Sequence, residues 1–255
     1  MSNLLKKLDN YWYHYKWPTL IALFFGIFCI IGIVQMTTKD KIDVNILYTG
    51  PYVFSPREVG EVEAAFEAVM SKDYNGDGEM GAEFTNIVLL TDDQVREVQQ
   101  NAKTGSNSAD AIDNVVIDGN GLREAENSFN QQIFAGEVVI CLLDPYWYNE
   151  VKAAAGFVKL SDVLGSKPEY AIDDYGVLLS DTNFAQYFKV FARLPEDTVL
   201  CMRTISTISI FTGREKTEEK WNWNAEMMRD LFAFEFPEGY DPEALEIDEA
   251  QTETE

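Results

Sequence analysis

The sequence predicts an α/β domain preceded by one transmembrane helix. Three observations lead to this prediction: a segment of nineteen uncharged residues near the N-terminus, an alternation of apolar runs with helical apolar stripes after it, and closely spaced apolar runs later in the chain. The alternating half predicts a mostly parallel sheet with helices on both faces. The later runs predict antiparallel strands added at the C-terminal side of that sheet.

The N-terminal segment has the length of a membrane span. Residues 18–36 carry no charge, and at about 1.5 Å per residue they form a helix of roughly 28 Å, close to the thickness of a hydrocarbon core. A cleavable signal has a shorter apolar region followed by a small-x-small site, so we expect a retained helix over 18–37. Pro18 fits the first turn of that helix. Residues 1–17 have apolar and aromatic side chains at helical spacing, which predicts an interfacial amphipathic lead-in, with a frayed start as the alternative.

The charge distribution predicts which side of the membrane the domain occupies. The chain has 20 basic and 43 acidic residues, of which three basic and one acidic precede residue 39, so the remainder carries a net charge of −25. Such a body is repelled by nucleic acid and by an anionic leaflet, which excludes both as partners. Three lysines before the span against two after it favour a cytoplasmic N-terminus. No N-x-Ser/Thr acceptor occurs, so we expect a bacterial single-pass membrane protein with an extracytoplasmic domain.

The extracytoplasmic domain is expected over 42–238, followed by an acidic disordered tail over 239–255. Ser55 and Glu58 have the spacing of a capping box, and Pro56 fits the first helical position, so the sequence predicts the start of a helix here. Cys141 and Cys201 lie in apolar runs, which leaves two buried thiols and a bridge between neighbouring strands both open. The expected strands are 43–48, 85–91, 114–118, 138–144, 175–181, 198–204 and 206–213, and the expected helices are 55–72, 92–102, 121–135, 145–155 and 217–235.

Histidine usage excludes most catalytic chemistry. The only histidine, His14, precedes the span, so the domain has no Ser-His-Asp or Cys-His nucleophile and no typical zinc site. We therefore predict no catalytic residues. Two carboxylates could still hydrolyse a glycoside, and the adjacent or neighbouring acids that could do so are Asp92 with Asp93, Asp173 with Asp174, and Asp144 with Glu150.

A calcium loop is the most specific local motif. Asp73, Asn75 and Asp77 occupy positions 1, 3 and 5 of DYNGDGEMGAEF, and Glu79 offers its carbonyl at position 7. Position 12, which should supply a bidentate acid, is Phe84. Calcium is therefore the candidate cofactor, and an Asn-Gly/Asp-Gly turn is the alternative.

A second candidate site follows the expected strand 138–144. Asp144, Tyr146 and Trp147 come directly after its carboxyl end, where open α/β sheets bind their ligands. The aromatic faces could stack on a sugar or another ring. Packing of the same residues along a helix face is the alternative.

The stretch from 129 to 164 resembles a segment of bacterial extracellular solute-binding proteins. Ala135-Gly136-Glu137, the apolar run 138–143, Tyr146, Gly156 and LSDVL at 160–164 carry the likeness. The resemblance implies an extracytoplasmic α/β fold that binds a small solute and feeds a transporter. The second lobe of such proteins would be missing here or reduced to the antiparallel strands, and a helix would replace the lipid anchor. The surrounding pattern also resembles membrane-anchored proteins of anaerobic Gram-positive bacteria.

Together these observations predict a membrane-anchored, non-enzymatic binding or accessory module. Its partner would be a small solute or another membrane protein. A cell-surface hydrolase that uses two carboxylates and a structural subunit of a membrane complex are the alternatives.

Overall fold

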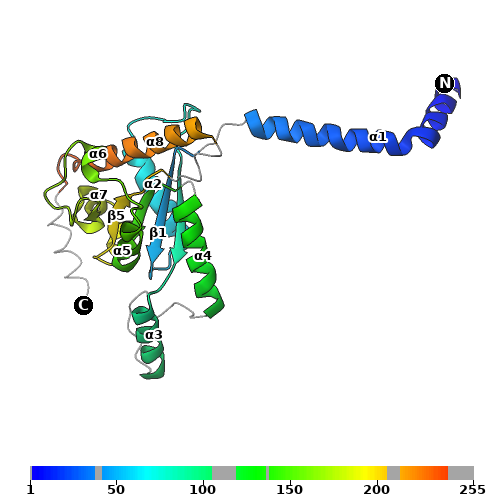
Figure 1. Ribbon diagram of the computed structural model, residues 1–255. Coiled ribbons are helices and arrows are strands. Elements are labelled where there is room, and N and C mark those ends of the chain that lie inside the picture. The colour runs from blue at the N-terminus through cyan, green and yellow to red at the C-terminus, as the bar shows by residue number, and fades with distance from the viewer. Residues whose placement is uncertain (1, 38–41, 105–118, 136–137, 206–212, 241–255) are drawn as a thin grey trace. The chain divides into compact units, whose positions relative to one another are not determined.

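A computed structural model describes residues 2–37, 42–104, 119–135, 138–205 and 213–240 of the chain. The chain divides into two compact units, 1–40 and 41–255 (Figure 1). The predicted strand 114–118, almost all of the predicted strand 206–213 and residues 241–255 of the predicted tail lie outside the described residues.

The first unit is one helix, α1 (Ser2–Thr37). The lead-in and the apolar segment are continuous, so Pro18 lies inside the helix and does not begin it. Proline removes one intrahelical hydrogen bond and displaces the preceding turn, and Figure 1 shows α1 bent near its N-terminal end. Among the described residues, no helix has both the length and the apolar character needed to cross a membrane.

The second unit is built on a five-stranded sheet in the order β2-β1-β3-β5-β4. The strands are β1 (Val44–Gly50), β2 (Ala82–Val88), β3 (Ile140–Leu143), β4 (Gly176–Leu178) and β5 (Val199–Met202). β1 pairs in parallel with β2 and β3, whereas β5 is antiparallel to β3 and β4. The antiparallel pairing predicted for the C-terminal strands is confirmed for 175–181 (β4) and 198–204 (β5), whereas almost all of 206–213 lies outside the described residues. Two of the four pairings among the described strands are antiparallel, so the expectation of a mostly parallel sheet is wrong in its pairing. The sheet is mixed because β5, placed between β3 and β4, runs against the other four described strands.

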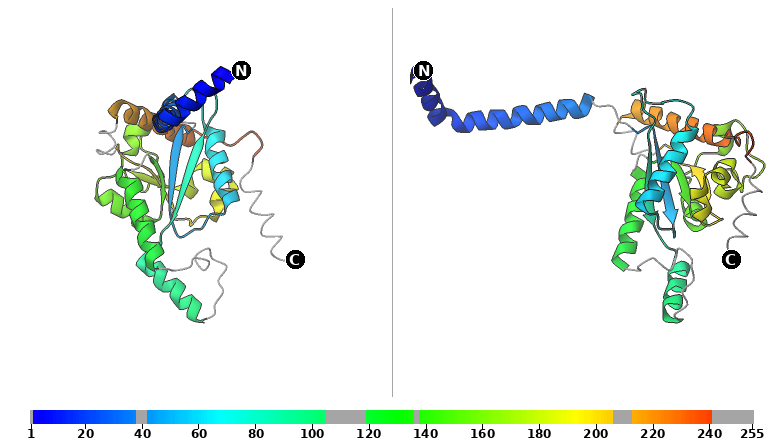
Figure 2. Two further views of the ribbon diagram at one scale, coloured as in Figure 1. Left: turned by 90° about the vertical axis from the view of Figure 1, so that its right-hand side faces the viewer. Right: turned by 180° about the vertical axis from the view of Figure 1, so that it is seen from behind.

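Helices cover both faces of the sheet. They are α2 (Pro56–Val69), α3 (Asp92–Thr104), α4 (Gly119–Ala135), α5 (Pro145–Ala153), α6 (Leu160–Leu164), α7 (Asn183–Tyr187) and α8 (Arg214–Phe232), with 3₁₀ turns η2 (Leu179–Asp181) and η3 (Lys189–Arg193). Ile46 and Tyr48 of β1 belong to a core shared with α2 and α8, and Leu47 between them belongs to a core shared with α4 and α5. Successive side chains of a strand point to opposite faces of the sheet, so β1 contributes to the core on each face. Figure 2 shows α2 and α4 on opposite sides of the sheet.

The predicted capping box starts α2. Ser55 accepts a hydrogen bond from the backbone N–H of Glu58, and the Glu58 carboxylate accepts one from the backbone N–H of Ser55 at 2.7 Å. The Tyr52 hydroxyl (2.7 Å) and the Arg193 guanidinium also donate to this carboxylate. Donation from Ser55 first, and then from the other two groups, lowers the pKa of Glu58 to about 2. Glu58 thus joins α2 to η3.

β2 begins three residues before the expected strand, because its start is set by a distant residue. The buried Asp43 carboxylate accepts hydrogen bonds from the backbone N–H groups of Asn75 (2.8 Å) and Gly81 (2.9 Å), and the Asp43 N–H donates to the Gly81 carbonyl. Ala82 then pairs with Val44 at the start of the parallel ladder. Asp43 therefore sets both the loop and the register.

Cys141 and Cys201 face each other across β3 and β5. Both are buried and free. Burial raises the pKa of Cys201 well above its ordinary value. The sequence left two alternatives open, buried thiols or a disulfide bridge, and the structure shows two buried thiols.

Candidate functional site

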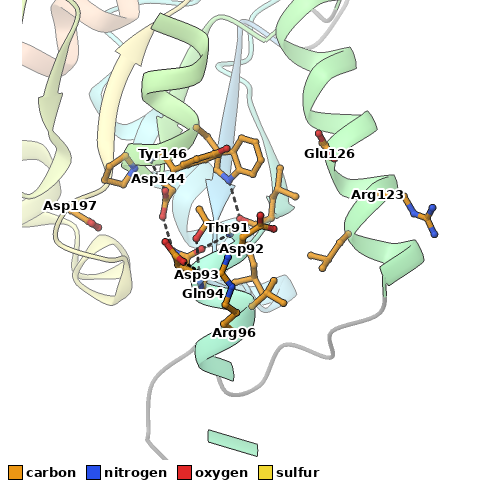
Figure 3. Close-up of a pocket in the computed structure, with 16 residues that line it drawn as sticks. Thr91, Asp92, Asp93, Gln94, Arg96, Arg123, Glu126, Asp144, Tyr146 and Asp197 are labelled. Atoms are coloured by element: carbon orange, nitrogen blue, oxygen red, sulfur yellow. Dashed lines mark hydrogen bonds and ion pairs between the residues drawn. The ribbon is translucent and has the colours of Figure 1, made fainter. Parts of the chain in front are cut away.

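A pocket of about 740 Å³ lies at the carboxyl ends of β2 and β3 (Figure 3). Asp144, Tyr146 and Trp147, the three predicted ligand residues, all line it. The other lining residues are Leu89, Leu90, Thr91, Asp92, Asp93, Gln94, Val95, Arg96, Leu122, Arg123, Glu126, Pro145 and Asp197. The segment after β2, the start of α5 and the first half of α4 thus come together in one hollow.

The strand connections explain the position of the pocket. After β1 the chain enters α2, which packs on one face, and after β3 it enters α5, which packs on the other. Neighbouring parallel strands whose connections leave to opposite faces open a crevice at their carboxyl ends. α3 extends beyond this edge of the sheet and adds a further wall (Figure 1).

The start of α3 is held by a second capping box. The Thr91 backbone N–H donates to Gln94 Oε1 at 2.8 Å, and the Gln94 backbone N–H donates to Thr91 Oγ1 at 3.3 Å. Gln94 Nε2 also donates to Asp144 Oδ2 at 2.9 Å. One glutamine side chain therefore joins the start of α3 to the start of α5. The Thr-x-x-Gln spacing was visible in the sequence, but the contact with Asp144 was not.

Asp144 is the N-cap of α5 and lies directly before Pro145. Its Oδ1 accepts from the Tyr146 backbone N–H at 2.8 Å, so both oxygens accept hydrogen bonds. Burial raises the pKa of Asp144, the bonds from Tyr146 and Gln94 oppose the rise, and the nearby charge of Asp197 adds to it. Asp144 is thus a buried acid whose hydrogen bonds favour its ionised form.

The two predicted aromatic residues differ in how firmly they are held. Trp147 Nε1 donates to the Leu89 carbonyl at 3.2 Å, and the Trp147 ring lies 5.4 Å from that of Phe129, centroid to centroid. Tyr146 meets Trp147 edge to face at 4.9 Å and is 51% exposed. Trp147 is a fixed part of the wall, whereas Tyr146 can be reached from solvent. Trp147 thus lines the pocket and also packs against Phe129, while a role in ligand binding stays a prediction.

The pocket carries more negative than positive groups. Five carboxylates line it, from Asp92, Asp93, Glu126, Asp144 and Asp197, against the guanidinium groups of Arg96 and Arg123. The sequence singled out Asp92, Asp93 and Asp144 but missed Glu126 and Asp197, which no local motif marks. They reach the pocket only because α4 and the segment before β5 fold to the same edge of the sheet.

The predicted calcium loop lies elsewhere, before β2. Its side-chain oxygens accept hydrogen bonds from its own backbone: Asp73 from Gly76 and Gly78, Asn75 from Asp77, and Asp77 from Glu79, at 2.6 to 2.9 Å. Within the described part of the chain, no group of three or more His, Cys, Asp or Glu residues is arranged to hold a metal ion. The Asp43 carboxylate and these side chains together shape the loop as a turn. Calcium binding here stays a prediction.

Asp173, one of the candidate hydrolytic acids, belongs to a different network. Its Oδ1 accepts from the Tyr148 hydroxyl at 2.6 Å and its Oδ2 from Lys152 Nζ at 2.9 Å. Asp174 is bonded to Lys167 at 3.3 Å. Asp173 therefore joins α5 to the segment before β4, and neither Asp173 nor Asp174 lines the pocket.

Comparison with known proteins adds no family to this description. No protein-family model, no curated protein and no solved structure matches the chain.

Proposed function

We propose that this chain is a membrane-anchored, non-enzymatic binding or accessory module whose α/β domain receives a small solute in the pocket at the carboxyl ends of β2 and β3. The observation that carries this proposal is the convergence of Asp144, Tyr146 and Trp147 with α3 and α4 around one hollow. Its volume lies within the range of small-molecule sites, and its walls combine aromatic faces with polar groups.

The proposal includes a membrane anchor formed by α1. The described side chains of the apolar segment are exposed around the helix, from Leu20 to Ile30, and a helix that is apolar on all sides needs an apolar surrounding. The apolar run of the sequence continues to Met36, although the side chains beyond Ile30 lie outside the described ones. We place the N-terminus in the cytoplasm and the acidic domain outside a bacterial cell, with no nucleic-acid partner.

A hydrolase with two carboxylates is less well supported. Asp144 is the lining acid with a raised pKa, as a general acid requires. Both of its oxygens, however, already accept N–H groups that cap α5 and join it to α3. A structural role in a membrane complex is the remaining alternative, and it requires no ligand in the pocket.

A thermal-stability panel on the full-length chain in detergent tests the binding function. Sugars, organic cations and organic anions are each added at millimolar concentration, and a ligand raises the unfolding temperature according to RT ln(1 + [L]/Kd). Tyr146→Ala should reduce the shift, while Tyr170→Ala, which removes a similarly exposed ring outside the pocket, should not. No shift with any class would refute the binding function and leave the structural role.

Protease treatment of intact cells tests the orientation. We expect an externally added protease to digest the domain, and alkaline carbonate to leave the remaining N-terminal fragment in the membrane pellet. A domain that is digested only after cell lysis, or a chain that carbonate releases, would contradict the proposed placement.

A further inference from the structure

The charged groups of the pocket point to the kind of solute it receives. The five lining carboxylates come from α3, α4, the N-cap of α5 and the segment before β5. Figure 3 shows Glu126 on the α4 wall, across from Asp93 and Asp144. The negative charge is therefore distributed over several walls.

Each of the two arginines of the pocket binds residues of its own helix. Arg96 Nη1 lies 2.7 Å from Asp93 Oδ1. Arg123 donates to the Gly119 carbonyl at 3.1 Å and to Asn120 Oδ1 at 2.9 Å, and Figure 3 shows its guanidinium directed away from the other labelled residues. Neither arginine neutralises Glu126 or Asp92 through a contact of this kind, so the described lining residues leave an excess of negative charge in the hollow.

The aromatic wall favours the same sign of ligand. Tyr146 is half exposed beside Trp147, whose ring is held by Phe129 and Leu89. An ammonium or guanidinium group within about 6 Å of such a ring is attracted by its quadrupole. The net charge of −25 after residue 38 adds a long-range attraction for cations and repels anions.

We propose that the pocket binds a small organic cation with two or more separated positive charges, a polyamine or a guanidino compound. This inference rests on the proposed binding function and specifies its ligand class. An extended cation can meet Glu126 on one wall and Asp92 on another while its chain lies along Tyr146. A neutral sugar could stack on the ring but would leave the carboxylates without countercharge, and an organic anion would be repelled.

Calorimetric titration of the full-length chain in detergent with spermidine tests the inference, with maltose and citrate as neutral and anionic probes. We expect spermidine to bind more weakly as salt rises from 20 to 150 mM, since charged groups at a surface are screened. Glu126→Gln and Asp92→Asn should each weaken binding about two- to fivefold, as expected for one exposed charge pair.

The matched controls are Glu124→Gln on α4 and Glu97→Gln on α3, two exposed acids that do not line the pocket. Each should change spermidine affinity less than about 1.5-fold, the low end expected for an exposed charge pair. If Glu124→Gln weakens binding as much as Glu126→Gln, the attraction belongs to the whole acidic surface and the inference fails. If maltose or citrate binds and spermidine does not, the cation assignment fails while the binding function stands. If no probe binds and the thermal panel is also negative, both fail.

Discussion

The hydrogen bond between Gln94 and Asp144 can be converted into a repulsion by one substitution. In Gln94→Glu, the new carboxylate can still accept the Thr91 backbone N–H, because glutamate is an ordinary partner in a capping box. It can no longer donate to Asp144. Two carboxylate oxygens then face each other at the position where the nitrogen and oxygen now lie 2.9 Å apart.

The size of the effect follows from that distance. Two unit charges about 3 Å apart, at an effective dielectric constant of about 40 between surface and water, repel by about 3 kcal/mol. Loss of the hydrogen bond adds about 1 kcal/mol, and rotation of the half-buried side chain away from Asp144 removes part of the sum. We expect the variant to be about 2–3 kcal/mol less stable than the parent at pH 7.

The pH dependence identifies the cause. Mutual repulsion raises the pKa of the carboxyl pair in the folded state above its unfolded value, so the lost stability returns as the pH falls and one group takes up a proton. Urea unfolding of the full-length chain in detergent, followed by tryptophan fluorescence at pH 7 and pH 4, measures this. Gln94→Met is the control, since it removes both hydrogen bonds without adding charge. The reasoning is refuted if the stability deficit of Gln94→Glu does not shrink between pH 7 and pH 4, or if it shrinks no more than the deficit of Gln94→Met.

Three further predictions concern the rest of the domain. Glu58→Gln should lower the free energy of unfolding by about 1–2 kcal/mol at pH 7. Because the pKa of Glu58 falls to about 2 in the fold, the difference in stability between parent and variant should vanish as the pH drops from about 4.5 toward 2. A difference that persists at pH 2 would contradict the role given to the ionised Glu58 carboxylate. Asp43→Ala should cost about 2–4 kcal/mol, since it leaves the partly buried backbone N–H groups of Asn75 and Gly81 without their acceptor. Urea unfolding checks this, and a loss no larger than that of Asp77→Ala would argue against it. Millimolar calcium should raise the unfolding temperature of the parent chain and not that of Asp77→Asn; no shift in the parent would leave residues 73–81 as a turn.

Several elements could be predicted because their signals are local. The Ser55–Glu58 box and the Asp144-Pro145 pair each satisfy backbone groups within four residues, so their geometry depends little on the remaining chain. The structure places α2 and α5 at these positions. The expected helices 121–135 and 217–235 differ from α4 and α8 by only a few residues at their ends.

Other features could not be read locally. The start of β2 depends on Asp43, more than thirty residues away in sequence. The position of β5 between β3 and β4 depends on pairing with strands that are distant in the chain. The run 198–204 is apolar whether its partner is parallel or antiparallel, because both of its faces are buried. The direction of this strand was therefore predicted from its short connections and not from the residues of the run itself.

By itself, the sequence determined which chemically reactive side chains the chain contains and in what order they occur. One histidine before an uncharged segment of nineteen residues, and a strong excess of carboxylates after it, are properties of composition and order that folding cannot change. Only the tertiary structure decided which of the 43 acidic residues lie together in one pocket. Asp92, Glu126 and Asp197 share one pocket because three segments reach the same edge of the sheet. Contacts between segments far apart in the chain have no periodicity or spacing in the sequence from which they could be predicted.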